Sequence, residues 1–144
     1  MRLFLDANIL FSAVHNPDGN ARALFSLARS GLVKLHVSGF ARDEAGRNVA
    51  LKFPQCREAL EDLLEAVWLV PEPQPQFVQA AKLAGLQEKD EPILAAATVA
   101  RVDALVTGER RHFGALFGQR VGDLILLSPA DASQHSLEHL PPSR

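Results

Sequence analysis

Short apolar runs alternate with longer stretches of helical spacing along this chain. The first run, residues 2–5, predicts a short buried strand that ends at Asp6. Four further runs of the same kind predict strands at residues 33–37, 67–70, 104–106 and 124–127. These runs are continuously apolar, which is typical of strands that are buried on both faces of a parallel sheet.

Helices are predicted between these strands, from the spacing of apolar residues and from the residues that start and stop helices. Gly31 is expected to end the helix over residues 21–29, and Ser38 to cap the helix that runs through Val49. The proline-rich segment 71–75 predicts a connector without regular structure. The expected helices cover residues 7–14, 21–29, 39–49, 54–66, 76–84, 92–100 and 110–117, with a last helix after Pro129.

This alternation predicts the α/β class, as a single-domain α/β/α sandwich with a central parallel sheet of about five strands. The domain is expected to span residues 1–132, and a polar C-terminal tail to follow over residues 133–144. Trp68, in the third strand, is expected to lie in the core. In open parallel sheets ligands bind beyond the carboxyl ends of the strands, so we expect functional residues at that edge.

The composition narrows the classes of function. Hydrophobic residues make up 47% of the 144 residues, enough for a core, and the net charge of −2 excludes a general basic coat for nucleic acid. A single cysteine, Cys56, excludes an internal disulfide and a cysteine-based zinc site. No signal peptide is evident, and no apolar run approaches the roughly 20 residues that cross a membrane. We therefore expect a soluble, cytoplasmic protein.

Five acidic residues fall where this topology predicts a site. Asp6 ends the first strand, Glu44 lies in the helix after the second strand, and Glu109 follows the fourth strand. Asp90 and Glu91 stand at the start of the helix that precedes the fourth strand. If the first and fourth strands are neighbours, Asp6 and Glu109 emerge close together. Asp6 also stands among apolar residues, where a carboxylate is costly unless it is paired, hydrogen-bonded or bound to a metal.

Each acid other than Asp6 has an ordinary structural explanation as well. Asp90 and Glu91 can cap a helix, and Glu44 and Glu109 can be solvated surface charges. Clustered carboxylates, however, repel one another, and a divalent cation removes that penalty. Oxygen ligands suit Mg²⁺ or Mn²⁺, and such a metal activates water and offsets charge on phosphorus oxygens. As a set, the acids indicate metal-dependent phosphate chemistry.

Several segments of the chain resemble the PIN-domain family, in the order that the family has them. They are LFLDANILFSA, RDEAGRNV around Glu44, KDEPILAAA, DALVTGERRHFG and ILLSPAD. The resemblance covers residues 2 to about 132 and implies a parallel sheet between helices, in agreement with the pattern above. Family members are mostly Mg²⁺- or Mn²⁺-dependent ribonucleases, and many are the VapC-type toxins of bacterial toxin–antitoxin pairs.

The resemblance implies a role for each acid. Asp6, Glu44, Asp90 and Glu109 match the four catalytic acids that hold the metal, and Glu91 competes with Asp90 for the third position. Adjacent helical residues point about 100° apart, so only one of the two is expected to face the metal, and we favour Asp90. Glu109 departs from the aspartate that is usual in the family, and its carboxylate stands one methylene further from the backbone.

Polar and basic neighbours complete the expected site. Asn8 matches a small polar residue that helps to orient it, and Thr107 is expected either to orient Asp6 or a phosphate, or to satisfy a strand end. Basic residues nearby are expected to meet an RNA backbone, with an ordinary solvated surface as the alternative. They are Arg42, Arg47, Arg110 and Arg111, with Lys89 and His112 close by in sequence.

The sequence thus predicts an endoribonuclease that hydrolyses RNA with metal-activated water, and a toxin that a partner antitoxin blocks. Homodimers are common in the family, and the helices around residues 21–30 and 54–66 are the expected dimer face. The alternative is a catalytically weak or inactive PIN-like module that binds RNA or a partner protein, which the glutamate at position 109 favours. An aspartyl phosphotransferase or receiver domain is disfavoured because no lysine follows Thr107. A haloacid-dehalogenase-type site is disfavoured because Asn8 stands where its second aspartate would be.

Overall fold

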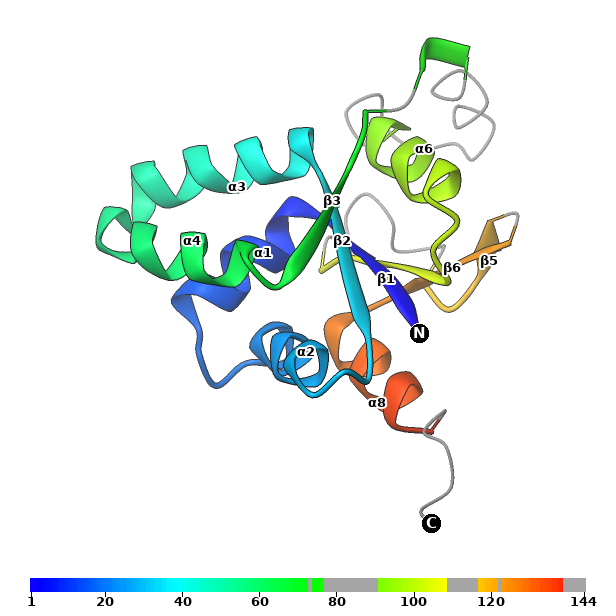
Figure 1. Ribbon diagram of the computed structural model, residues 1–144, viewed down its shortest axis with the longest axis horizontal. Coiled ribbons are helices and arrows are strands. Elements are labelled where there is room, and N and C mark those ends of the chain that lie inside the picture. The colour runs from blue at the N-terminus through cyan, green and yellow to red at the C-terminus, as the bar shows by residue number, and fades with distance from the viewer. Residues whose placement is uncertain (73, 77–90, 109–116, 122, 139–144) are drawn as a thin grey trace.

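A six-stranded sheet forms the centre of the molecule in the computed structural model (Figure 1). The structure describes residues 1–72, 74–76, 91–108, 117–121 and 123–138. The strand order is β3-β2-β1-β4-β6-β5, and neighbouring strands are parallel except for β5, which runs antiparallel to β6. The strands are β1 (Arg2–Leu5), β2 (Lys34–Ser38), β3 (Val67–Val70), β4 (Ala104–Val106), β5 (Arg120–Val121) and β6 (Leu124–Leu127).

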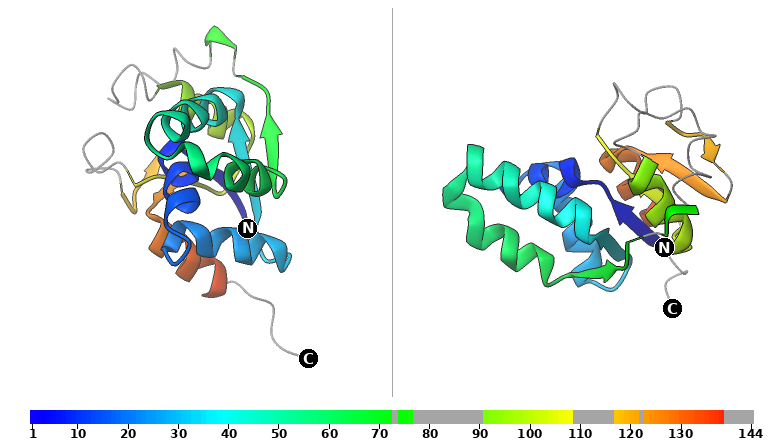
Figure 2. Two further views of the ribbon diagram at one scale, coloured as in Figure 1. Left: turned by 90° about the vertical axis from the view of Figure 1, so that its left-hand side faces the viewer. Right: turned by 90° about the horizontal axis from the view of Figure 1, so that it is seen from above.

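Helices cover both faces of this sheet, which confirms the predicted α/β/α sandwich. Figure 1 shows α1, α3 and α4 on one side and α6 on the other, while α2 packs against α1 and α8. The antiparallel pair α3 and α4 projects beyond the sheet (Figure 2). The helices are α1 (Ala7–His15), α2 (Asn20–Arg29), α3 (Gly39–Lys52), α4 (Arg57–Leu64), α6 (Glu91–Val99) and α8 (Pro129–Glu138), with one 3-10 turn, η1 (Pro54–Cys56), before α4.

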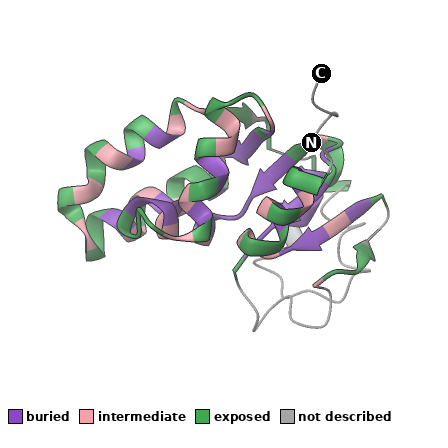
Figure 3. Cartoon of the chain, turned by 90° about the horizontal axis from the view of Figure 1, so that it is seen from below, coloured by how far each residue is buried: buried purple, intermediate pink, exposed green. Residues whose placement is uncertain are grey.

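The middle position of β1 explains why its sequence is continuously apolar. Leu3, Phe4 and Leu5 are each completely buried, because β2 and β4 flank the strand and helices cover both of its faces. The same arrangement recurs in β4, whose residues are all buried. Figure 3 shows burial concentrated in these central strands, with exposed residues along the outer helices. The strand that ends at Asp6 is therefore held by neighbouring strands on both edges and by helices on both faces.

The predicted helix boundaries at Gly31 and Ser38 are confirmed by their hydrogen bonds. Gly31 adopts a φ of 79°, a left-handed conformation that glycine enters without steric cost. The N–H groups of Gly31 and Leu32 then donate to the carbonyls of Ala28 and Leu27, which closes the end of α2. At the start of α3, the Ser38 hydroxyl accepts a hydrogen bond from the N–H of Ala41 at 3.1 Å.

The prediction that Trp68 lies in the core is wrong. Trp68 is 62% exposed, and the next residue, Leu69, is 55% exposed. Both residues belong to β3, an edge strand that pairs with β2 and has no other neighbour among the described strands. Helices cover a strand at the edge of the sheet less completely than a central strand. An apolar sequence therefore does not by itself place a strand in the core.

Other expectations fall at the margins of the fold. The two-residue strand β5 was not predicted, because it is too short to show an apolar pattern. Most of the helix expected over residues 76–84, and residues 110–116 of the helix expected at 110–117, lie outside the described residues. Phe117, the last residue of that second helix, instead forms a parallel bridge with Leu126.

The last described helix, α8, is part of the packed structure. Its residues Ala132 and Ser136 are buried, and the helix packs against α2. Ser128 precedes it, and its hydroxyl accepts a hydrogen bond from the N–H of Asp131 at 3.1 Å. Among the described helices, none combines the length and apolar character that crossing a membrane requires.

A buried histidine in β2 makes the stability of the fold dependent on pH. His36 is 6% exposed, and its Nδ1 lies 3.2 Å from the carbonyl oxygen of Leu3. Burial, with the positive charge of Arg2 as a smaller cause, lowers the pKa of the imidazole below its ordinary value of 6.5. The unfolded chain therefore takes up a proton at a higher pH than the folded chain does.

Above about pH 6.5 the titration of His36 should not change the free energy of unfolding. Below that pH the free energy of unfolding should fall, because the unfolded chain binds a proton at His36 more readily than the folded chain. The measurement is urea denaturation of the wild type and of His36→Gln between pH 8 and pH 5. The glutamine variant keeps a group that can donate to Leu3 but does not titrate, so its stability should fall less steeply. Equal slopes for the two proteins would contradict this role of His36.

Candidate active site

The carboxylate of Asp6 stands at the carboxyl end of the central strand. The Asp6 N–H donates to the carbonyl of Val106 at 3.0 Å, so the residue continues the pairing of β1 with β4. Its backbone is extended, with ψ of 159°, and α1 begins at the next residue. Asp6 therefore closes the strand and caps the helix, and the N-terminal end of α1 favours its negative charge.

Hydrogen bonds from three described residues hold the Asp6 carboxylate, although only 6% of the residue is exposed. The Ala7 N–H donates to Oδ1 at 2.8 Å. The Thr107 hydroxyl donates to Oδ2 at 2.9 Å, and the Asn8 amide donates to the same oxygen at 3.2 Å. A buried carboxylate needs such donors, because burial without them is costly. Together they fix the side chain in one orientation.

Asn8 joins this carboxylate to the end of β4. Its Nδ2 also lies 3.2 Å from the hydroxyl oxygen of Thr107, and its Oδ1 accepts the N–H of Gly108 at 2.9 Å. Thr107 is completely buried. The structure thus brings together three of the residues that the sequence singled out, Asp6, Asn8 and Thr107, across about 100 positions of the chain.

Glu44 lies in the second turn of α3, which begins at the carboxyl end of β2. Because β2 is the parallel neighbour of β1, α1 and α3 both start at the same edge of the sheet. Glu44 is half-buried beside Ala41 and Ala45, which face the core, and its carboxylate makes no hydrogen bond or ion pair with any described residue. Within the described part of the chain, no group of three or more acidic, histidine or cysteine side chains is assembled.

Helix α6 indicates where Glu91, the predicted acid at its start, lies relative to the sheet. The end of this helix lies against β1, since the Arg2 guanidinium donates to the carbonyls of Ala100 and Arg101 at the amino edge of the sheet. The helix therefore begins, at Glu91, toward the opposite, carboxyl edge of the sheet, where Asp6 lies. Only the backbone of Glu91 is described. Asp90, Glu109, Arg110 and Arg111 lie outside the described residues, as do Lys89 and His112.

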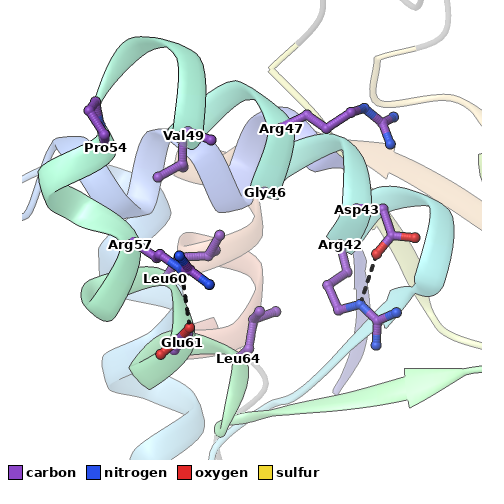
Figure 4. A pocket seen from close by; sticks show the side chains of 11 residues that line it. Arg42, Asp43, Gly46, Arg47, Val49, Pro54, Arg57, Leu60, Glu61 and Leu64 are labelled. Atoms are coloured by element: carbon purple, nitrogen blue, oxygen red, sulfur yellow. Dashed lines mark hydrogen bonds and ion pairs between the residues drawn. The ribbon is translucent and has the colours of Figure 1, made fainter.

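Two of the predicted basic residues border a groove between α3 and α4 (Figure 4). The groove has a volume of about 700 Å³, with Val49, Leu60 and Leu64 among its apolar lining. Arg42 pairs with the neighbouring Asp43 at 3.2 Å, whereas Arg47 extends away from the α4 side chains. Both arginines are exposed and lie on the helix that carries Glu44.

Glu72 is a carboxylate at this edge that the sequence analysis did not select. Its Oε1 accepts a hydrogen bond from the N–H of Phe40 at 2.7 Å, in the first turn of α3. A Cβ at Gly39 would lie 3.2 Å from the same oxygen, so the absence of a side chain there leaves room for the contact. The signal in the sequence was an acid two residues after an apolar run, but the prolines on both sides of it gave no indication of a contact with a helix 32 residues earlier.

The described side chains offer oxygen donors in a partly desolvated position. Asp6 and Glu44 supply carboxylates. The amide of Asn8 and the hydroxyl of Thr107 lie beside the carboxylate of Asp6. This donor set has the chemistry that hard divalent cations prefer, and contains no soft sulfur ligand.

A parallel sheet covered on both faces, with a buried carboxylate after its central strand, defines an α/β domain with an acidic site at the sheet edge. The chain matches the family model described as PIN domain over residues 2–111, and it belongs to the PIN-domain family. Curated protein sequences provide no match.

Solved structures with the same fold come from several organisms. VapBC2 from Rickettsia felis, bound to a DNA fragment from its promoter, is 19% identical with a TM-score of 0.65, covering 89% of this chain and 98% of that chain. PAE2754 from Pyrobaculum aerophilum is 13% identical with a TM-score of 0.67, covering 96% and 97%. FitAcB from Neisseria gonorrhoeae is 18% identical with a TM-score of 0.60, covering 89% and 98%. At these identities the likeness is one of fold.

Replacing Thr107 by valine should destabilise the fold, because the valine side chain keeps the shape but removes a donor to the buried Asp6 carboxylate. The expected loss is about 1.5–3 kcal/mol, the range for hydrogen bonds to charged groups. Urea denaturation in EDTA measures it without a contribution from bound metal. Thr98→Val is the matched control, since the exposed Thr98 hydroxyl donates within α6 to the carbonyl of Leu94, and should change stability by less than about 0.5 kcal/mol. Equal losses for the two variants would contradict the link between Thr107 and Asp6.

Proposed function

We propose that this PIN-domain protein is a divalent-metal-dependent endoribonuclease. The observation that carries the proposal is the buried Asp6 carboxylate, which donors on three of the described residues hold in one orientation at the carboxyl end of the central strand. A carboxylate in that position, in a chain of this family, is suited to serve as a fixed ligand rather than as a surface charge.

Mg²⁺ or Mn²⁺ is the cofactor that this donor set fits. Asp6 and Glu44 would hold it, with Asp90 or Glu91 as the third acid and Glu109 as the fourth. When bound, the metal supplies Lewis-acid activation of water and stabilises charge on the phosphate. Thr107 and Asn8 are positioning residues in this scheme, because they bond the Oδ2 atom of Asp6 and thereby restrict the directions from which it can act.

Binding of the RNA backbone is assigned to arginines around this edge. Arg42 and Arg47 on α3 are exposed, and Arg110 and Arg111 follow Glu109 in the sequence. Arginine guanidinium groups match phosphate oxygens in geometry as well as in charge. Because the protein as a whole has a net charge of −2, phosphate contacts must come from such local groups rather than from a general basic surface.

The Asp6→Asn variant tests the enzymatic proposal. Cleavage of a single-stranded RNA of mixed sequence, with Mn²⁺ or Mg²⁺, should fall at least roughly 10- to 100-fold. That is the loss typical of removing a residue that only hydrogen-bonds to a metal ligand, and removal of the ligand itself should cost no less. The wild type should bind Mn²⁺ in calorimetry and the variant should not. Asp18→Asn is the control, because Asp18 is an exposed carboxylate in the turn before α2 and should leave both measurements unchanged.

Two results would contradict the proposal in different ways. Full cleavage by a correctly folded Asp6→Asn protein would remove Asp6 from the site. A wild type that neither cleaves RNA nor binds Mn²⁺ would favour the alternative, a PIN-like module that binds RNA or a partner without cutting.

We further propose that the protein acts in the cytoplasm as the toxin of a toxin–antitoxin pair. The support is membership of a family rich in such toxins, together with the fold shared with structures named VapBC and FitAcB. Induced expression of the wild type in a bacterial host should arrest growth, and expression of Asp6→Asn should not. Co-expression of the protein encoded beside this gene should restore growth. Undisturbed growth at matched levels of soluble wild-type protein would contradict the toxin proposal.

A further inference from the structure

A second hollow opens directly beside the Asp6 network. It has a volume of about 400 Å³ and lies where α1 ends and where α2 and α8 begin. Thr107 and Gly108 line it. The same two residues bond to the network, since the Thr107 hydroxyl donates to Asp6 and the Gly108 N–H donates to Asn8. Thr107 and Gly108 therefore belong both to the lining of the cavity and to the Asp6 network.

One face of α1 connects the two places. Asn8 and Ser12 are four residues apart in this helix, so their side chains lie on the same face in successive turns. Asn8 belongs to the Asp6 network, and Ser12 lines the cavity. This face of α1 therefore runs from the Asp6 network to the cavity.

The chemistry of the cavity differs from that of the groove between α3 and α4. None of the described residues that line it carries an ionisable side chain, whereas Arg42, Arg47 and Arg57 border the groove. A phosphate would find no cationic side chain among these lining residues. The lining thus suits an uncharged group of a ligand.

Polar side chains in the cavity have unused hydrogen-bonding capacity. The side chains of Ser12, Asn16 and Asn20 make no hydrogen bond with any described residue. Each asparagine amide presents a donor and an acceptor side by side, a pairing that matches the edge of a nucleobase. Phe117 and Pro129 add apolar surface to the same cavity, on which a flat ring can lie.

The position of the Asn16 amide depends on the absence of a side chain at Gly19. A Cβ at Gly19 would stand 2.7 Å from Asn16 Nδ2, closer than a real contact allows. The backbone of Gly19 has a φ of −82°, which alanine adopts without strain. Gly19→Ala should therefore turn the Asn16 amide aside without removing it, while the Asn16 carbonyl oxygen, 3.3 Å from that Cβ, shifts by a few tenths of an ångström at most.

We propose that this cavity is a nucleobase subsite, which binds one unpaired base of the RNA strand whose phosphate lies at Asp6. Asn16 and Asn20 read the edge of the base, and Phe117 supports its ring. This inference rests on the proposed ribonuclease function and adds selection of the base next to the cleaved bond. Recognition of splayed-out bases through their edges is the general way in which proteins read single-stranded RNA.

The first experiment is independent of cleavage. Adenosine, guanosine, cytidine and uridine are titrated separately into ¹⁵N-labelled protein in EDTA, and the side-chain amide signals are followed by NMR. Spectra of Asn16→Ala and Asn20→Ala assign the two signals. At least one nucleoside should shift both of them, and the amide of Gln55, an exposed residue in η1 before α4, should not move. Nucleosides carry no phosphate, so a metal site does not contribute.

The second experiment reads the cleaved sequence. A randomised single-stranded RNA is cut with Mn²⁺, and the fragment ends are sequenced. The wild type should prefer one base at a fixed distance from the cut, and Asn16→Ala and Gly19→Ala should each lower that preference on the order of tenfold. Gln55→Ala is the matched amide control and should keep the wild-type profile.

The outcomes separate this inference from the function on which it rests. An unchanged base profile in Asn16→Ala, or the absence of any shift at Asn16 and Asn20 with all four nucleosides, overturns the base subsite while RNA cleavage stands. A wild type that does not cut RNA contradicts the proposed function, and the nucleoside titration alone then decides whether the cavity binds a base.

Discussion

The burial of one carboxylate at the end of the central strand is the constraint on which the rest of this site depends. Asp6 follows three completely buried residues and is itself almost inaccessible. A charge in that position requires donors, and the fold provides them from the first turn of α1 and from the residue after β4. Parallel pairing of β1 with β4 is what brings these groups together, because it places the carboxyl ends of both strands at one edge.

The groove between α3 and α4 and the cavity beside the Asp6 network differ in chemistry. On α3, exposed arginines border an open groove, which suits the phosphates of a nucleic acid. Toward α2 and α8, the described lining of the smaller cavity is uncharged and carries free amides and a hydroxyl. Asn8 links Asp6 to the smaller cavity, since it bonds both Asp6 and the cavity residue Gly108. Such a division fits the proposed ribonuclease, which would have to hold a charged backbone and distinguish a neutral base.

Sequence reasoning succeeded where local and tertiary preferences agree. The strand over residues 2–5 was predicted with its observed boundaries, because a short apolar run before a helix-capping aspartate has few other structures available. Gly31 and Ser38 were identified from their intrinsic preferences, and the structure uses both in that way. The prediction failed for Trp68, whose sequence resembles that of a central strand. Its exposure follows from the position of β3 at the sheet margin, which depends on strand order.

The sequence by itself determined the α/β class, the order of the elements and the candidate acids, because these depend on periodicity, on capping residues and on motifs that are local in the chain. Only the tertiary structure decided that Thr107 bonds to Asp6 and Asn8, that Glu72 reaches the start of α3, and that a cavity whose described lining is uncharged adjoins the site. Those contacts join residues far apart in the chain. Their existence depends on which strands are neighbours, and short apolar runs of similar composition do not specify that order.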